Sequence, residues 1–187
     1  MATAVAFCME LFENGLIDSK ELGTIELKWG DPKASEALIR MIAFREGFGD
    51  TLAEGLKVAA HKIGGMAAEY SIEANNMALP GHDPRAYTSV ALGYATSTRG
   101  PCHTNSFSHI FEWGATFPEI GIDEVLDRFE LDGKAEMVIK AQDLGSLWEN
   151  LALCKFNYFG GVQLQHVSQW LKYVTGWEMT TEELMEV

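Results

Sequence analysis

GDPKASEALIRMIAFREG, residues 30–47, contains the signals that decide the fold class of this chain. Asp31 stands where a helix N-cap accepts backbone hydrogen bonds, and Pro32 follows at the first helical position, where no partner for its missing N–H is needed. Gly47 is placed to end the helix. The apolar stripe consists of Leu38, Ile39, Ile42 and Ala43. These features together predict an amphipathic helix that buries one face.

Similar signals recur along the chain and predict a mainly α, multi-helical fold. Residues 70–80 fit a short strand, and residues 97–120, which are rich in Gly and Pro, predict a long loop of the kind that often carries function. Further helices are expected over residues 2–14, over 51–63 with a capping box at Thr51 and Glu54, from 83–85 to about 96, near Asp123, over 134–154, over 162–174 and from Thr180 to the end of the chain. The expected architecture is two helical lobes with little or no β, residues 1–80 and 81–187, with the boundary between Tyr70 and Pro84. The first helix has no capping residue beyond Thr3, which indicates a fragment of a longer protein.

The composition excludes several classes of protein. The 187 residues carry 14 basic and 27 acidic side chains, a net charge of −13, so the basic surface that nucleic-acid binding requires is missing. The longest apolar run, residues 4–9, is far shorter than the ~18 residues of a membrane span. Three widely spaced cysteines make no disulfide framework, which favours a reducing cytoplasm. The sequence leaves a homo-oligomer open.

The residue types with catalytic or metal-binding chemistry give only weak signals by themselves. His103 lies beside Cys102 in the Gly-rich loop and could transfer protons at neutral pH, but a polar histidine on a surface loop is the commoner explanation. Cys154 follows a predicted helix and fits a buried core thiol better than a ligand. The other histidines, His61, His82, His109 and His166, have no zinc-ligand spacing. Spacing alone therefore predicts no complete metal site within the chain.

Six motifs, in the same order along most of the chain, carry a resemblance to a known family. They are AVAFCMELFENGLI at 4–17, LKWGD at 27–31, IAFREGFGDTLAEG at 42–55, LPGHDPR at 79–85, YATSTRGPCH at 94–103, and the segment that ends in CKF at 154–156. In these motifs the chain resembles domains 2 and 3 of the aldehyde ferredoxin oxidoreductase family, the tungsten- or molybdenum-pterin enzymes. The resemblance implies that the first lobe corresponds to the end of domain 2 and the second lobe to an incomplete domain 3.

The resemblance also implies roles for individual residues. The family has an Asp-x-x-Gly-x-Cys segment that binds the pterin and supplies the last ligand of a 4Fe-4S cluster, and it corresponds here to residues 149–154, with Glu149 for Asp and Ala152 for Gly. Cys154 is then the cluster ligand. The residues implied in pterin binding are Glu149, Asn150 and Leu153. His103 is implied as the catalytic histidine, with Cys102 as a weaker candidate.

The activity implied by the resemblance is the interconversion of aldehydes and carboxylic acids at a tungsten or molybdenum bis-pterin, with ferredoxin or another electron-transfer protein as partner. The other cluster ligands of the family lie upstream of Met1, so the isolated chain is expected to hold no stable cluster and to be inactive. Two alternatives stay open. The aromatic residues of 104–113 also suit a reductase of aryl-CoA thioesters, and a non-catalytic helical module would bind only protein.

Overall fold

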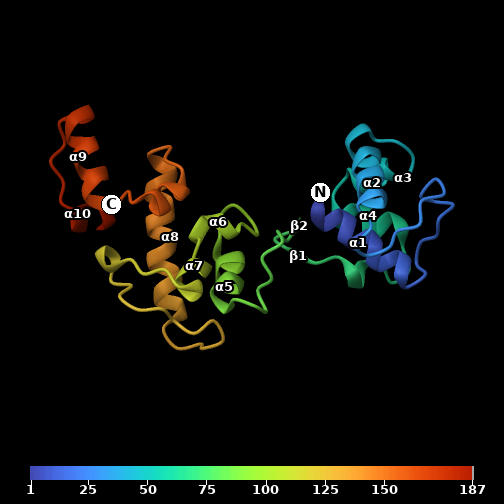
Figure 1. Ribbon diagram of the computed structural model, residues 1–187, viewed down its shortest axis with the longest axis horizontal. Coiled ribbons are helices and arrows are strands. Elements are labelled where there is room, and N and C mark those ends of the chain that lie inside the picture. The colour runs from blue at the N-terminus through green and yellow to red at the C-terminus, as the bar shows by residue number, and fades with distance from the viewer. Residues whose placement is uncertain (187) are drawn as a thin grey trace. The chain divides into compact units, whose positions relative to one another are not determined.

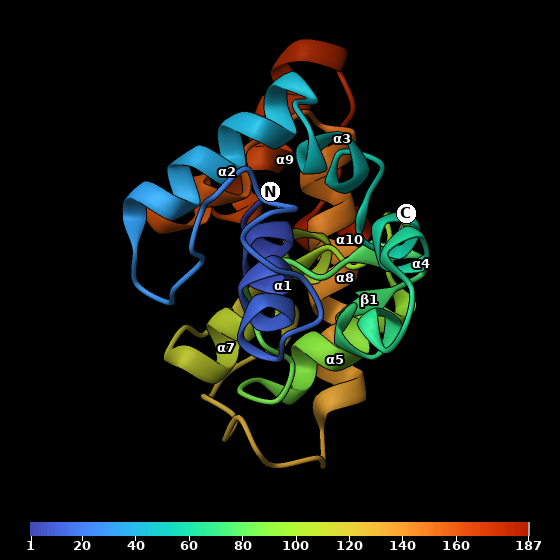
Figure 2. The same ribbon diagram turned by 90° about the vertical axis from the view of Figure 1, so that its right-hand side faces the viewer.

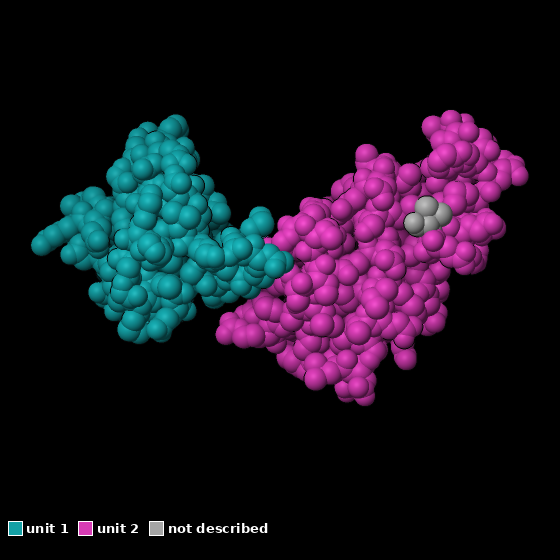
Figure 3. All heavy atoms as spheres, turned by 180° about the vertical axis from the view of Figure 1, so that it is seen from behind, with its two compact units in different colours: residues 1–81 teal, residues 82–187 magenta. Residues whose placement is uncertain are grey.

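The computed structural model describes residues 1–186 and has a mainly α fold, as predicted (Figure 1). Its β structure, within these residues, is one two-stranded antiparallel sheet and one isolated bridge between Phe117 and Ile122. The chain divides into two compact units, Met1–Gly81 and His82–Val187, which Figure 3 colours separately. None of the described helices combines the length and the apolar character that crossing a membrane requires.

Unit 1 contains α1 (Ala2–Glu13), α2 (Pro32–Phe44), α3 (Phe48–Leu52), α4 (Leu56–Ile63), the 3-10 helix η1 (Ala67–Tyr70), and strands β1 (Glu73–Ala74) and β2 (Met77–Ala78) (Figure 2). Asp31 caps α2 as predicted, because its carboxylate accepts hydrogen bonds from the backbone N–H groups of Lys33 at 2.9 Å and Ala34 at 3.3 Å. The helix ends when Arg45 takes the left-handed conformation, φ 56°. One core cluster joins the helices of the unit; its fully buried members include Cys8, Leu11, Leu22, Leu38 and Ala59.

The predicted helix over 51–63 is in fact two helices, so the capping box at Thr51 and Glu54 is wrong. Thr51 lies inside α3, and α4 begins after Gly55, whose φ of 93° no helix accommodates. The close packing of α3 on α2 explains why α3 forms before this break. A Cβ on Gly49 would overlap the backbone of Met41, so only glycine permits this approach.

Unit 2 contains α5 (Thr88–Thr96), α6 (His103–Ser106), α7 (His109–Trp113), η2 (Pro118–Ile120), α8 (Lys134–Asn150), η3 (Lys155–Gly160), α9 (Leu164–Thr175) and α10 (Thr181–Glu186). The long helix α8 packs against α5 and α6 and also contacts α10 (Figure 1). The cap predicted at Thr180 is confirmed by reciprocal hydrogen bonds between Thr180 and Glu183. The helix was predicted to continue to the end of the chain, and its last position, Val187, lies outside the described residues. The main core cluster of the unit, around Phe111, Leu144 and Leu164, lies along α8.

The helices of unit 2 differ from the prediction in several places. The loop over 97–120 contains α6 and α7, which are too short to give a periodic signal. No helix forms near Asp123, and α5 starts at Thr88 because Tyr87 before it is extended. The helix predicted to reach Cys154 stops at Asn150, and Ala152 then turns the chain with a left-handed φ of 54°.

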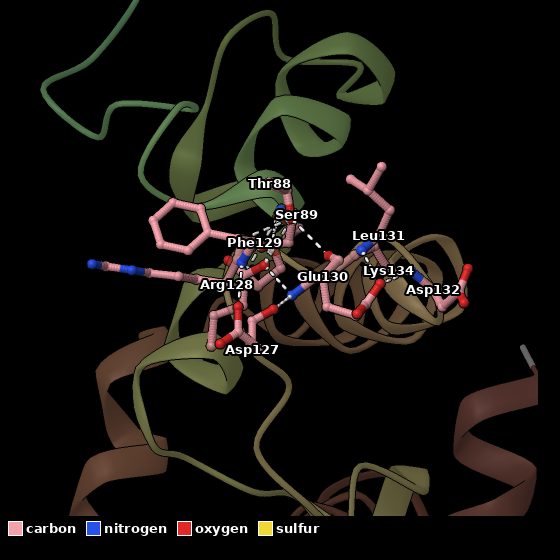
Figure 4. A network of polar contacts seen from close by, with 12 residues as sticks. Thr88, Ser89, Asp127, Arg128, Phe129, Glu130, Leu131, Asp132 and Lys134 are labelled. Carbon is pink, nitrogen blue, oxygen red and sulfur yellow. Dashed lines mark hydrogen bonds and ion pairs between the residues drawn. The ribbon is translucent and has the colours of Figure 1, made fainter.

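A buried ion pair between Glu112 of α7 and Lys134, the first residue of α8, holds unit 2 together. Lys134 Nζ lies 2.5 Å from Glu112 Oε1, and the side chains of Lys134 and Glu112 are 2% and 0% exposed. Ser89 of α5 donates from its hydroxyl to Glu112 Oε2 at 2.8 Å, and Lys134 also donates to the Asp127 carbonyl at 2.6 Å. Figure 4 shows Lys134 enclosed by Thr88, Ser89 and Asp127. The bond from Lys134 to the Asp127 carbonyl links this ion pair to residues 123–133, which are irregular and do not form the helix expected near Asp123.

Candidate functional site

Three histidine rings lie together in unit 2. His103 is the first residue of α6, His109 is the first residue of α7, and His82 precedes α5. The rings of His82 and His103 are stacked, with centroids 3.9 Å apart and planes 11° apart. The His109 ring lies 4.7 Å from that of His82 and 6.1 Å from that of His103. The structure thus gives His103 two imidazole neighbours that no spacing in the sequence indicated.

In the histidine cluster formed by His82, His103 and His109, the surroundings lower the pKa of His103 and of His109. Burial lowers the pKa of His109 to about 4, with further lowering by His82 and His103. Burial, His82 and Lys155 in turn lower the pKa of His103 below its ordinary value of 6.5. His109 is 4% exposed, and its Nδ1 has no hydrogen-bond partner among the described residues. At pH 7 the site therefore holds rings that can accept a proton, which is the state a general base requires.

Aromatic side chains adjoin the histidine cluster. The Phe107 ring lies edge-on to His109, with centroids 5.1 Å apart, and it also contacts the rings of Phe156 and Phe159. Phe156 and Phe159 are 64% and 57% exposed. The site therefore includes exposed apolar rings, joined through Phe107 to groups that can transfer protons.

Cys102 immediately precedes α6 and is half-buried. Its Sγ lies 3.1 Å from Thr104 Oγ1. Burial acts to raise the pKa of the thiol, but hydrogen bonds with Thr104 and the charge of Arg99 outweigh it, so the pKa is lowered. Cys102 is thus more easily ionised than an ordinary thiol, although no second observation assigns it a ligand.

Cys154 is an exposed free thiol four residues beyond the end of α8, so the expectation of a buried core thiol is wrong. Cys8 is the buried one, and burial raises its pKa to about 12. Within residues 1–186 no three His, Cys, Asp or Glu side chains are grouped as metal ligands. An accessible thiol fits one ligand of an iron–sulfur cluster, and the chain's described residues do not complete the set.

The three residues expected to bind pterin occupy different positions. Glu149 accepts hydrogen bonds at Oε1 from Lys155 Nζ, at 2.5 Å, and from Arg99. Asn150, the last residue of α8, is exposed and lines a cavity of about 540 Å³ between α8 and the C-terminal helices. Leu153 packs against the core cluster around Trp148, and its N–H donates to the Trp148 carbonyl at 2.8 Å. Glu149 alone of the three lies in a polar network with the segment that carries His103.

Comparisons with known proteins match the chain to one enzyme family, in which several of the similar relatives contain tungsten. The family model described as aldehyde ferredoxin oxidoreductase, domains 2 & 3, matches residues 1–187. The tungsten-containing aldehyde ferredoxin oxidoreductases of Pyrococcus furiosus and Thermococcus kodakarensis are 36% and 33% identical to the chain over 186 residues, which is 98% of this chain and 29% of each relative. The chain thus spans less than a third of the length of these curated relatives.

Two further matches are more distant. The WOR-like subunit of an aliphatic sulfonate oxidoreductase from Pyrococcus furiosus is 35% identical over 109 residues, 54% of this chain and 17% of that protein. The solved active-site complex BamBC of benzoyl coenzyme A reductase, bound to 1,5-dienoyl-CoA, matches with a TM-score of 0.62 and 19% identity, over 98% of this chain and 32% of that chain. The structural match shows a shared fold.

Proposed function

The chain belongs to the aldehyde ferredoxin oxidoreductase family, as the sequence motifs predicted, and from this membership we propose that it is part of a tungsten- or molybdenum-pterin oxidoreductase that interconverts aldehydes and carboxylic acids. In this proposal unit 1 corresponds to the end of domain 2 and unit 2 to domain 3. Ferredoxin or another electron-transfer protein accepts the electrons, and the reaction takes place in the cytoplasm.

The observation that carries the proposal is the exposed thiol of Cys154, at the position that matches the cluster ligand of the family. The chain turns at Ala152 through a left-handed conformation, which matches the glycine of the family's segment and presents Cys154 outside the core. One accessible thiol supplies one of the four ligands of a 4Fe-4S cluster. When bound, the pterin-held metal would supply the redox chemistry, and a cluster held in part by Cys154 would supply electron transfer.

His103 is proposed to accept a proton during this reaction. Oxidation of an aldehyde, with water as the source of the added oxygen, gives a carboxylic acid, two protons and two electrons for the acceptor, so a base is required close to the substrate. His103 suits this role because its lowered pKa keeps it neutral at pH 7, and the stacked His82 disfavours a charge on both rings at once.

Glu149, Asn150 and Leu153 are proposed to contact the pterin, with Glu149 as the charged member. Lys155 and Arg99 both bind Oε1 of Glu149, so Oε2 is the atom that would accept a hydrogen bond from a pterin N–H. Leu153 would contribute its backbone, since its side chain packs against the core.

The test of the proposal is an iron count on the complete protein, isolated without oxygen. The Cys154→Ser variant should lose most of its iron and its cluster absorption. The matched control, Cys8→Ala, changes a thiol that is fully buried in unit 1 and should keep its iron. Equal iron in the Cys154→Ser variant and the native protein would refute the assignment, and a native protein without metal would favour a non-catalytic helical module.

A second candidate substrate class is favoured by the exposed rings of Phe156 and Phe159 beside the histidine cluster. The aryl ring of an aryl-CoA thioester would pack against such exposed aromatic rings. Assays of the complete protein with aliphatic aldehydes and with aryl-CoA thioesters separate the two classes. Turnover of aryl-CoA alone would replace the aldehyde proposal, and turnover of aldehydes alone would support it.

A further inference from the structure

Lys155, which directly follows Cys154, bonds to the short helix that begins with His103. Its Nζ donates to the backbone carbonyls of Thr104 and of Asn105, the latter at 3.2 Å. The same ammonium lies 2.5 Å from Glu149 Oε1, and the Lys155 side chain is only 12% exposed. Hydrogen bonds from a charged donor that is shielded from water are stronger than exposed ones. Lys155 therefore joins three parts of unit 2: the residues after His103, the end of α8, and the segment of Cys154.

The helix α6 needs such external support because it has only four residues, His103–Ser106. A helix of one turn leaves most of its carbonyl groups without partners inside the helix. Lys155 supplies a partner for two of them, and a positive charge at helical carbonyls is favourable. The position of α6 thus depends on contacts with groups outside the helix.

The helix α8 supports α6 from a second side. A Cβ on Gly145 would overlap the carbonyl oxygen of Asn105 and would lie 3.2 Å from Lys155 Nζ, so the two backbones meet where only glycine fits. Gln142, one turn earlier, donates to Asn105 Oδ1 at 3.3 Å. The backbone of α6 is consequently held between α8 and the ammonium of Lys155.

Glu149 connects Lys155 to the segment that precedes His103. Besides Lys155, its Oε1 binds the guanidinium of Arg99, which lies four residues before His103. The Arg99 side chain is 49% exposed, so its ion pair is the weaker of the two. Of the three charged side chains of Arg99, Glu149 and Lys155, that of Lys155 has the most hydrogen-bond partners and the smallest exposed fraction.

We propose that Lys155 is a positioning residue that couples the segment of Cys154 to His103, by holding the Thr104 and Asn105 carbonyls and the Glu149 carboxylate at one ammonium. The inference rests on the proposed roles of Cys154 and His103. In the complete protein, a change in the position of Cys154 would reach α6 through Lys155. The placement of the His103 ring would then depend on the position of Cys154.

The first test measures hydrogen exchange and histidine titration by NMR in the full 187-residue chain. In the Lys155→Met variant, the backbone amides of Asn105 in α6 and of Phe107 directly after it should exchange with solvent about tenfold faster than in the native chain. These amides donate to the Cys102 and His103 carbonyls. The titration midpoint of His103 should also rise, since the charge of Lys155 lowers the pKa of His103. The Lys155→Arg variant, which keeps the charge, should restore most of the midpoint.

The matched control is Lys172→Met, which removes a lysine whose ion pair with Glu178 is exposed. It should leave α6 exchange and His103 unchanged. Unchanged α6 exchange in Lys155→Met would overturn the proposal. Equal acceleration in α6 and α9 would also overturn it, because Lys155 would then only stabilise the unit as a whole.

A second test uses the complete metal-loaded protein. Lys155→Met should keep its iron but show a changed pH profile of kcat, as expected when His103 loses its position; an unchanged profile would contradict the coupling. The same variants distinguish a failure of the proposed function from a failure of this inference. If Cys154→Ser keeps its iron while Lys155→Met still loosens α6, the support of α6 by Lys155 stands and the assignment of Cys154 as ligand falls.

Discussion

Removing the charge of Glu112 should destabilise unit 2 more than any single surface substitution. The carboxylate is fully buried and accepts hydrogen bonds from Lys134 Nζ at 2.5 Å, the Ser89 N–H at 3.2 Å and the Ser89 hydroxyl at 2.8 Å. Glu112→Gln keeps the shape and an acceptor for Ser89, but it leaves the ammonium of Lys134 buried without its counter-charge. Breaking a buried pair on one side costs about 3–5 kcal/mol.

Urea unfolding monitored by tryptophan fluorescence measures this cost, because four of the five tryptophans, all except Trp29, belong to unit 2. With a slope of about 2 kcal/mol per molar urea, the midpoint of unit 2 should fall by about 2 M. The double variant Glu112→Gln with Lys134→Met removes both charges and should cost clearly less than the sum of the single variants.

The control is Glu136→Gln, which breaks the i,i+4 pair with Lys140 on the same helix at a side chain that is 73% exposed, and it should leave the midpoint unchanged within error. A loss below about 1 kcal/mol in Glu112→Gln, or strictly additive single effects, would refute the reasoning that the pair is energetically coupled.

Three further predictions concern single positions in unit 2. Ala152→Gly should raise the free energy of unfolding by about 0.5–1 kcal/mol, since Ala152 has a left-handed φ of 54°; an unchanged or lower urea midpoint would contradict this. Gly145→Ala should lower it by about 1–3 kcal/mol, because the new methyl group overlaps the Asn105 carbonyl, and α6 amides should lose protection at the same time. Burial lowers the pKa of His109 to about 4 from 6.5, so stability should be full above pH 6.5 and should fall by about 3 kcal/mol as the pH drops to 4. His109→Gln should remove this part of the pH dependence, as urea midpoints at pH 7, 5.5 and 4 would reveal.

The parts of the fold that the sequence predicted are those set by local chemistry. Asp31 and Pro32 start α2 wherever it packs, because capping involves only neighbouring backbone groups. The pattern at Thr51 and Glu54 had the same form, yet no helix begins there. Gly49 packs on α2 within α3, and a capping pattern contains no information about such contacts. Similarly, the end of α8 depends on the turn at Ala152, which an alanine does not signal.

The candidate site was predicted only in part, and through the family resemblance. The family resemblance implied roles for His103 and Cys154. It implied none for His109, nor for His82, although His82 lies in the motif LPGHDPR. The grouping of the three rings could not be predicted, since 21 and 6 residues separate His82 and His109 from His103 along the chain and only the packing of unit 2 brings the rings together. Lys155 gave no signal either, because a lysine in a helix-ending segment is ordinary until its carbonyl partners are known.

The exposure of Cys154 also has a practical consequence for biochemical work on the chain. An accessible free thiol oxidises in air and forms disulfides between molecules. A chain purified aerobically would therefore contain covalent dimers that have no interface of their own and disappear with reductant. Mass measurements in the presence and absence of reductant separate such cross-linked pairs from a true homo-oligomer, and alkylation of Cys154 at the start of a preparation prevents them.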